Sequence, residues 1–181
     1  MQNFDLQVID TFSLEIKGKE EMIREKLSDD YRTLNIDYAR FYKMNSLCKL
    51  GFLGSEKIIS KNVTLIKSTP KDKIATIFFN KSSSLVSDYE HRQSLGNDIL
   101  PSPSVFVYTL PNILNGEIAI RNSWTGYNAF YILDKYDEVV IKDLIVTGRY
   151  GQPFDLCLSA WVETDLLHEK FSLITTLYKV S

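Results

Sequence analysis

The sequence predicts an α/β protein whose mixed sheet is flanked by helices. Segments with strand-like patterns alternate along the chain with segments of helical spacing, which favours a sheet with helices on both faces. Two of the strand-like segments, residues 73–80 and 154–162, are almost uninterrupted apolar runs, as expected of strands covered on both faces. The length of 181 residues and the apolar fraction of 44% predict one domain, covering residues 1–181.

The first third of the chain contains one strand and one clear helix. Residues 10–17 alternate loosely between apolar and polar side chains, which indicates a strand. Residues 19–30 are highly charged and are typical of a solvated helix or loop. Residues 43–59 place a set of small and apolar side chains on one helical face, so we expect a helix packed on the core. This face comprises Met44, Leu47, Cys48, Gly51, Ser55 and Ile59.

The middle of the chain predicts a buried strand, a loop and a second helix. Residues 73–80 form the strand, and the polar residues 82–94 begin as a loop. At residues 100–104, Ser102 is a suitable N-cap and Pro103 suits the first helical position, so a helix should run from there through Ala119. Pro111 should kink this helix, because proline lacks a backbone N–H.

The last third predicts three strands and one helix. Residues 127–133 form a strand, and residues 136–147 form a helix that Gly148 and Gly151 bring to an end. Residues 154–162 form a buried strand, and residues 171–180 form a strand that pairs back after a turn.

Composition excludes several classes of function. The formal net charge of -2 gives no field that would draw nucleic acid or an anionic membrane. No apolar run is long enough to span a membrane, and residues 1–14 lack the basic segment of a signal peptide. No spacing of His, Cys and carboxylate residues indicates a metal, and we expect no cofactor. The pair Gly148 and Gly151 is not a nucleotide fingerprint, because no helix follows it.

Few side chains qualify as reactive groups. Cys48 and Cys157 both lie in apolar surroundings, so we expect buried, inert thiols and a reducing compartment, the cytoplasm. His91 and His168 lie in polar stretches and are expected to be solvated. The three serines of residues 82–84 could bind an anion through turn amides, although a plain loop is the simpler interpretation. Asp88 and Glu90 are not expected to act as a pair.

Several stretches, in order between residues 41 and 163, resemble the amino-terminal half of a β-ketoacyl synthase of the thiolase fold. Residues 41–50 resemble an early helix of that family, and the strand that ends at Asn80 precedes a small-residue turn. Residues 101–121 resemble the helix before the nucleophile strand, in the style of homologues found with bacterial aryl-polyene and flexirubin-type pathways. Residues 126–133 take the place of the nucleophile strand. The helix at residues 137–148 and the strand at residues 154–161 complete the set.

The departures from the family bear directly on activity. A ketosynthase attacks its acyl thioester with a cysteine at the turn after the nucleophile strand. The resemblance places that turn near Asp134 and Lys135, and neither is a thiol. The catalytic histidines of the family belong to a second half that has no counterpart in these 181 residues, and His91 and His168 match neither. No catalytic residue is therefore assigned, and decarboxylative condensation is not expected.

The resemblance implies a non-catalytic partner or chain-length-type subunit in fatty-acid or polyketide-type biosynthesis. In ketosynthase dimers the nucleophile strand pairs with its mate across a two-fold axis, so we expect a ketosynthase-like partner or a second copy at this strand. Two alternatives stay open: a module that binds acyl carrier protein or an acyl thioester, and an acyltransferase- or thioesterase-like enzyme with an unlocated nucleophile. The expected interface residues are Tyr127, Asn128, Ala129, Phe130, Tyr131, Ile132 and Leu133.

Overall fold

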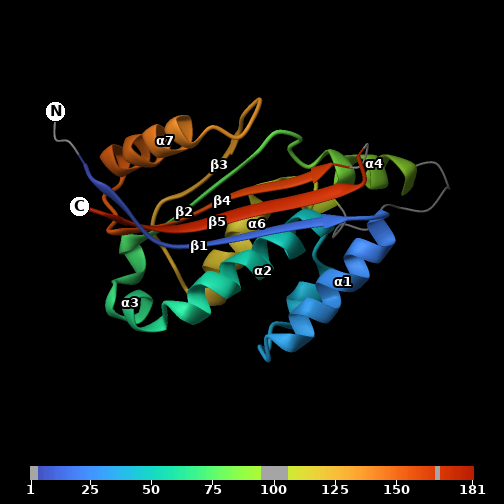
Figure 1. The fold of residues 1–181 in the computed structure, drawn as a ribbon, viewed down its shortest axis with the longest axis horizontal. Helices are drawn as coiled ribbons and strands as arrows, with labels where there is room; N and C mark the ends of the chain where they lie inside the picture. The colour runs from blue at the N-terminus through green and yellow to red at the C-terminus, as the bar shows by residue number, and fades with distance from the viewer. Residues whose placement is uncertain (1–3, 95–105, 166–167) are drawn as a thin grey trace.

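A computed structural model describes residues 4–94, 106–165 and 168–181 of the chain (Figure 1). Five strands form one sheet with the order β1-β5-β4-β2-β3. Strand β2 runs parallel to β3 and β4, whereas β5 runs antiparallel to β4 and β1. The strands are β1 (Leu6–Lys17), β2 (Ile74–Asn80), β3 (Asn128–Ile132), β4 (Leu156–Asp165) and β5 (Lys170–Val180). The helices are α1 (Glu20–Thr33), α2 (Ser46–Lys61), α3 (Val63–Ser68), α4 (Leu85–Ser94), α6 (Ile113–Asn122) and α7 (Glu138–Gly151), with short 3₁₀ turns η1 (Ala39–Lys43) and η2 (Lys71–Lys73).

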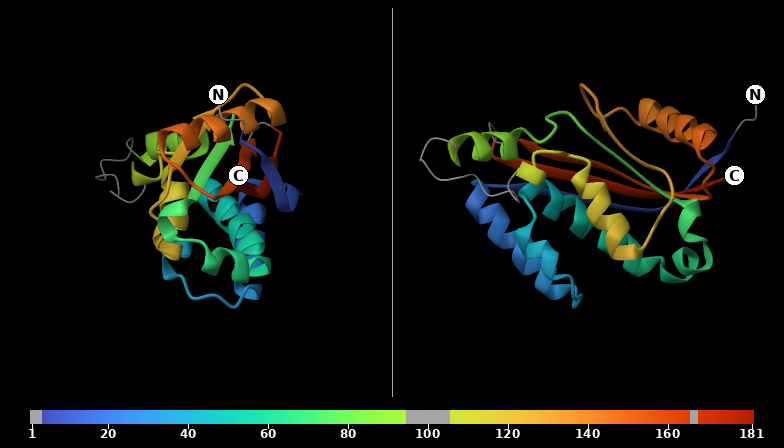
Figure 2. Two further views of the ribbon diagram at one scale, coloured as in Figure 1. Left: turned by 90° about the vertical axis from the view of Figure 1, so that its left-hand side faces the viewer. Right: turned by 180° about the vertical axis from the view of Figure 1, so that it is seen from behind.

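The two faces of the sheet are covered unequally (Figure 2). Helices α1, α2 and α6 pack on one face, where the larger hydrophobic cluster forms around Phe52, Phe78 and Leu158. Helix α7 covers the other face, where Ile141 and Ile145 meet Ile77 and other apolar strand residues. Because successive residues of a strand point to opposite faces, β2 contributes to both clusters. This mixed sheet between helices is the α/β fold that the sequence predicts.

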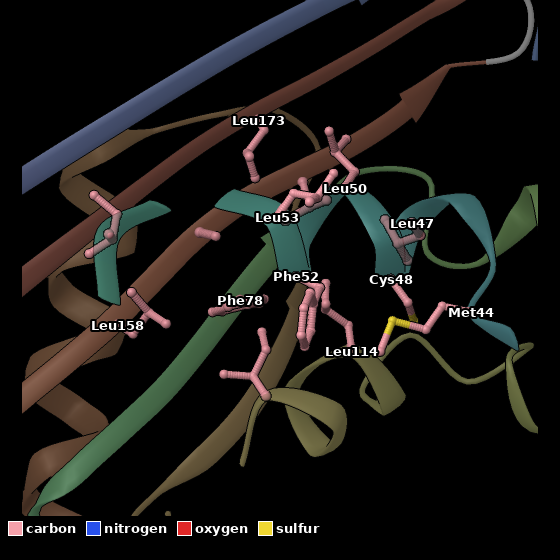
Figure 3. Packing of buried hydrophobic residues seen from close by; sticks show 14 of the residues in the cluster. Met44, Leu47, Cys48, Leu50, Phe52, Leu53, Phe78, Leu114, Leu158 and Leu173 are labelled. Carbon is pink, nitrogen blue, oxygen red and sulfur yellow. The ribbon is translucent and has the colours of Figure 1, made fainter. Parts of the chain in front are cut away.

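Helix α2 is the central helix of the larger cluster (Figure 3). The Asn45 side chain caps its first turn by accepting a hydrogen bond from the Cys48 N–H at 2.9 Å. Gly54 lies against β5, and a Cβ at this position would come within 2.2 Å of Leu173 Cδ2. Glycine at this position therefore lets the helix pack close to the sheet.

Each predicted strand corresponds to a strand of the structure. β1 is longer than expected, because its pairing with β5 begins at Leu6. Every residue of β2 is buried, as its apolar run predicts. In β4 the strand continues past Val162 to Asp165, where it carries polar side chains. The predicted helix at residues 43–59 corresponds to α2, and residues 82–94 form a short loop and then α4. Residues 19–30 belong to α1, which is more than a solvated helix because Ile23, Leu27 and Tyr31 are buried.

Two predictions about helix boundaries are wrong. The helix expected to continue to Ala119 is interrupted, since Pro111 lies in a turn and α6 begins at Ile113. The predicted helix start at residues 100–104 lies outside the described residues. Gly148 and Gly151 do not follow the helix at residues 136–147 but lie within α7. A Cβ at Gly148 would come within 2.7 Å of the Tyr127 ring, so this glycine is required for close packing rather than for helix termination.

None of the helices described is long and apolar enough to cross a membrane.

Candidate functional site

The candidate site lies at the carboxyl ends of the three parallel strands. Between β2 and β3 the chain passes through α4 and then α6, and α6 packs on one face of the sheet. After the neighbouring strand β3 the chain enters α7, which covers the other face (Figure 1). A crevice opens where two neighbouring strands send their connections to opposite faces, and open α/β sheets bind ligands there. This arrangement selects one end of the molecule before any side chain is considered.

A cavity of about 570 Å³ occupies this end of the sheet. This volume falls within the range of about 300–1,000 Å³ that is usual for ligand pockets. The turns after β2 and β3, the end of β4 and the first turn of α4 contribute its walls. The lining residues are Lys81, Ser82, Leu85, Val86, Asp134, Lys135, Trp161, Glu163, Thr164, Asp165 and His168.

Asp134 and Lys135 lie in the turn that begins after β3 and line this cavity. The last inter-strand hydrogen bond before them joins the Leu133 N–H to the Asn80 carbonyl oxygen at 2.8 Å. Both residues are exposed, so this turn presents a carboxylate and an ammonium group to solvent.

Glu163 joins the end of β4 to the turn after β2. Its Oε2 accepts a hydrogen bond from the Lys81 N–H at 2.7 Å, and its Oε1 accepts one from the Ser82 hydroxyl. The Thr164 N–H lies 3.2 Å from the same Oε1. The turn amide and the serine hydroxyl that could have bound an external anion therefore bind a carboxylate of this chain.

The other wall of the cavity carries His168 and Trp161. His168 is exposed, as expected, and its Nδ1 lies 2.7 Å from Asp165 Oδ2. Trp161 is 8% exposed and its ring meets the Tyr136 ring edge-on, with centroids 5.8 Å apart. Sequence reasoning missed Trp161 and Glu163 as site residues. The one signal available was their position near the end of a buried strand.

The two thiols lie away from this cavity. Cys48 and Cys157 are free and buried, as predicted. Burial raises the pKa of both thiols well above the usual value for cysteine, so thiolate is scarce at neutral pH. The expectation of a solvated His91 is wrong, because its side chain is half-buried with the ring centroid 5.8 Å from that of Phe106. Asp88 and Glu90 have different partners: Asp88 lies 3.3 Å from the Ser84 hydroxyl, whereas Glu90 pairs with Arg24.

Strand β3 lies at the edge of the sheet and pairs only with β2 among the described strands. Phe130 and Tyr131 are half-buried and Ile132 is 50% exposed, whereas their register partners Phe78, Phe79 and Asn80 are buried. In the part of the chain that the structure describes, no group of three or more His, Cys, Asp and Glu residues is arranged to hold a metal ion.

No protein-family profile matches this chain, and no curated protein matches it. Solved structures of ketosynthases do match. The ketosynthase (ApeO) in complex with its chain length factor (ApeC) from Xenorhabdus doucetiae is 12% identical, with a TM-score of 0.64 over 96% of this chain and 78% of that chain. The ishigamide ketosynthase/chain length factor is 15% identical, with a TM-score of 0.61 over 76% of this chain.

A third structure, AntDE:AntF, is a type II PKS acyl-carrier protein in complex with its ketosynthase bound to the hexaketide. It is 10% identical, with a TM-score of 0.65 over 96% of this chain. The matches span 62% of the chain in this structure and 44% of the ishigamide protein, so this chain covers less than two thirds of either. At these identities the likeness concerns the fold, and this chain has the thiolase-like α/β fold that the resemblance predicted.

Proposed function

We propose that this chain is a non-catalytic, β-ketoacyl-synthase-like subunit that pairs through β3 with a ketosynthase-like partner or with a second copy. Its role is that of a chain-length-type subunit in cytoplasmic fatty-acid or polyketide-type biosynthesis, of the aryl-polyene kind. The observation that carries the proposal is the open, uncharged edge of β3 beside the cavity. The likeness to ketosynthase and chain length factor structures supports the same role.

The backbone of β3 has hydrogen-bonding groups available on its outer side. The Tyr127 carbonyl accepts from the Thr76 N–H at 2.9 Å, and the Leu133 N–H donates to Asn80 at the other end of the strand. Because side-chain and backbone directions alternate along a strand, the odd-numbered residues bond to β2. The N–H and C=O groups of Asn128, Phe130 and Ile132 therefore point toward the open edge, where another strand could pair.

The side chains of β3 lack the features that protect an exposed edge. The strand Asn128–Ile132 contains no charge and no proline, and three of its five side chains are large and apolar or aromatic. An edge of this kind invites pairing with another strand unless a partner covers it. A partner strand would bury the exposed half of Ile132 as well as the backbone groups.

Association is tested by light scattering at micromolar concentration, together with identification of co-purifying proteins. Ile132→Lys places a charge on the outer edge of β3, and we expect it to weaken association at least tenfold. Val8→Lys is the matched control, because Val8 is 49% exposed on the opposite edge and Ile132 is 50% exposed. A wild-type protein that stays monomeric, has no co-purifying partner and keeps the same mass after Phe130→Asp would contradict the pairing.

The absence of condensation chemistry is tested by intact-mass analysis after incubation with acyl thioesters. We expect no stoichiometric adduct, because Asp134 and Lys135 stand where the resemblance places the nucleophile and both thiols are buried. Asp134→Cys supplies an exposed thiol at this turn but should still give no condensation, since a thiol alone cannot manage the proton transfers. Turnover by this variant, or by the wild type through Cys48 or Cys157, would contradict the proposal.

A second candidate function is an acyltransferase- or thioesterase-like activity, which the cavity favours through Ser82 and the Asp165–His168 pair. In this reaction the Ser82 oxygen would attack the thioester carbonyl, the hydroxyl proton would pass to a neighbouring base, and the thiol would leave. The geometry favours a structural role for Ser82, because its hydroxyl donates to Glu163, which also holds the turn amide. An acyl adduct that is lost in Ser82→Ala would establish this second function, whereas thioester binding without an adduct would indicate the binding-module alternative.

A further inference from the structure

A second pocket, of about 360 Å³, lies at the opposite end of the parallel strands from the candidate site. It is formed by the end of α2, by α3, by the segment leading into β2 and by the end of α6, close to the amino ends of β2 and β3. Its lining residues are Ile59, Val63, Ile66, Lys67, Thr69, Lys71, Arg121, Asn122 and Trp124. It shares no residue with the cavity at the carboxyl ends.

The wall of this pocket contains Arg121, which forms an ion pair with the buried Glu56 and lies over the Tyr38 ring, with 5.9 Å between its Cζ and the ring centroid. Within residues 4–94, 106–165 and 168–181, the guanidinium of Arg121 makes no hydrogen bond, and its Nε lies 3.7 Å from Glu56 Oε1. The side chain is 30% exposed, so water satisfies only part of it. Its Nε is buried without a hydrogen-bond partner in the described residues, which costs free energy. The fork of N–H donors on a guanidinium matches the two oxygens of a carboxylate.

The rim of the pocket is basic well beyond this arginine. Residues 57–73 contain five lysines and one acidic residue, although the whole chain carries a net charge of -2. Lys67 and Lys71 are exposed and line the pocket, and neither has a carboxylate within 4.0 Å in the described structure. Among the described residues, no ion pair therefore neutralises the charges of Lys67 and Lys71 at this end of the molecule.

The floor of the pocket is apolar. Trp124 is 7% exposed and Ile66 is 8% exposed, and Val63, 39% exposed, forms part of the mouth. An apolar floor with a few converging polar groups is the usual make-up of a small-molecule site, and the volume lies in the usual range. The combination suits a ligand that has an apolar body and one anionic head.

We propose that this pocket binds an amphiphilic carboxylate, such as a medium-chain fatty acid, with the carboxylate on Arg121 and the chain against Trp124 and Ile66. Lys67 and Lys71 attract the anion and remain at the rim. The pocket contains no residue of β3 and none of the cavity at the carboxyl ends, so this proposal does not depend on the proposed subunit role.

The chain has two tryptophans, and each pocket contains one of them, Trp124 here and Trp161 in the candidate site. Trp161→Phe therefore leaves Trp124 as the reporter of the proposed pocket. Titration of this variant with octanoate should give a saturable change in tryptophan emission, and octanol at the same concentrations should bind at least tenfold more weakly. Circular dichroism recorded in parallel confirms that the protein stays folded.

Variants in the Trp161→Phe background locate the site. Because Arg121→Gln alone would leave the buried Glu56 without its cation, Arg121→Gln is combined with Glu56→Gln, and we expect octanoate affinity to fall at least tenfold. Val63→Asp, at an exposed position of the mouth, should have a similar effect through repulsion. Lys26→Gln removes a charge from α1 and should change nothing.

Four results would overturn this proposal: no saturable signal, equal affinity for octanol, equal loss in Lys26→Gln, or an equal response of Trp161 in Trp124→Phe. The last would assign the ligand to the other cavity. A failure to detect pairing through β3 by light scattering would contradict the proposed subunit role but would not affect the proposed carboxylate site.

Discussion

The two edges of the sheet, β1 and β3, differ in length, in charge and in the regularity of their pairing. β1 has 12 residues, carries Asp10, Glu15 and Lys17, and has a register irregularity between Val8 and Asp10. β3 has five residues and no charge, and its side chains are largely half-buried although no described strand lies beyond it. Charged side chains and bulges are the usual protection of a solvent-facing edge. β1 is thus suited to face water, whereas β3 is suited to a partner.

The largest effect that we expect is a loss of unfolding free energy, and it should differ between β3 and the neighbouring strand β2. Phe78 of β2 and Phe130 of β3 are register partners, yet Phe78 is 0% exposed and Phe130 is half-buried. Phe78→Ala should cost about 3–5 kcal/mol of unfolding free energy, because it leaves a cavity in the core. Phe130→Ala should cost less than about 2 kcal/mol. Urea denaturation of the isolated chain measures both, and equal costs would mean that β3 is not an edge.

The next largest effect that we expect comes from proline substitutions in and just after β3. They distinguish a backbone N–H that bonds to β2 from one that points toward the open edge. Leu133→Pro removes the N–H that donates to the backbone carbonyl of Asn80, a residue that is 0% exposed. It should therefore destabilise the fold by about 1–3 kcal/mol beyond Leu133→Ala. Ile132→Pro removes an outward N–H and is tolerated in the way that prolines on edge strands are. Ile132→Pro should abolish association while lowering the unfolding free energy less than Leu133→Pro does. If urea denaturation showed Ile132→Pro to be less stable than Leu133→Pro, the assignment of odd-numbered residues to β2 and even-numbered residues to the open edge would be wrong.

A smaller effect concerns how β3 is anchored to the helix beside it. Gly148→Ala in α7 brings a methyl group within 2.7 Å of the Tyr127 ring, whose hydroxyl lies 3.0 Å from that of Tyr131. We expect destabilisation of about 1 kcal/mol or more, as in other overpacked sites. Gly151→Ala has no atom within 4 Å of its new methyl group and should be neutral or stabilising by up to about 1 kcal/mol through helix propensity. Thermal melts should therefore show a lower midpoint for Gly148→Ala and an unchanged or higher midpoint for Gly151→Ala.

The parts of this fold that the sequence could predict are those with a local signal. The apolar run of β2 and the helical spacing of α2 specify their elements without knowledge of neighbours. The spacing of Ile23, Leu27 and Tyr31 in α1 was present too, but the surrounding charges concealed it.

Contacts between distant residues account for what the sequence could not predict. The sequence predicts a helix end at Gly148, because the Tyr127 ring that requires a glycine there lies 21 residues away. The hydrogen bond between Ser82 and Glu163 joins residues 81 positions apart. No local sequence pattern could therefore show that the turn after β2 binds a carboxylate of this chain. The pairing of β1 with β5, which makes β1 an edge, likewise depends on tertiary structure.

The smallest expected effect concerns the charges of the β1 edge. Glu15 Oε2 lies 2.7 Å from Lys170 Nζ of β5, and Glu15 Oε1 lies 3.5 Å from Lys17 Nζ. The hydrogen bond from Lys170, aided by the charges of both lysines, lowers the pKa of Glu15 below its ordinary value. A carboxyl group with a lowered pKa in the folded state stabilises the protein above its unfolded pKa, and this stabilisation is lost as the pH falls through the folded pKa.

Lys170→Gln should therefore lower the urea midpoint slightly at pH 7 and leave it unchanged near pH 2, where the carboxyl group is protonated in both proteins. NMR titration should show the Glu15 pKa rising toward its ordinary value in the variant. Because the pair is exposed, 1 M salt should remove most of the difference at pH 7. The mass in light scattering should not change, since these charges lie on the β1 edge and the proposed pairing uses β3. A change of mass in Lys170→Gln that matches the effect of Ile132→Lys would mean that both edges take part in association, and the contrast between them would fail.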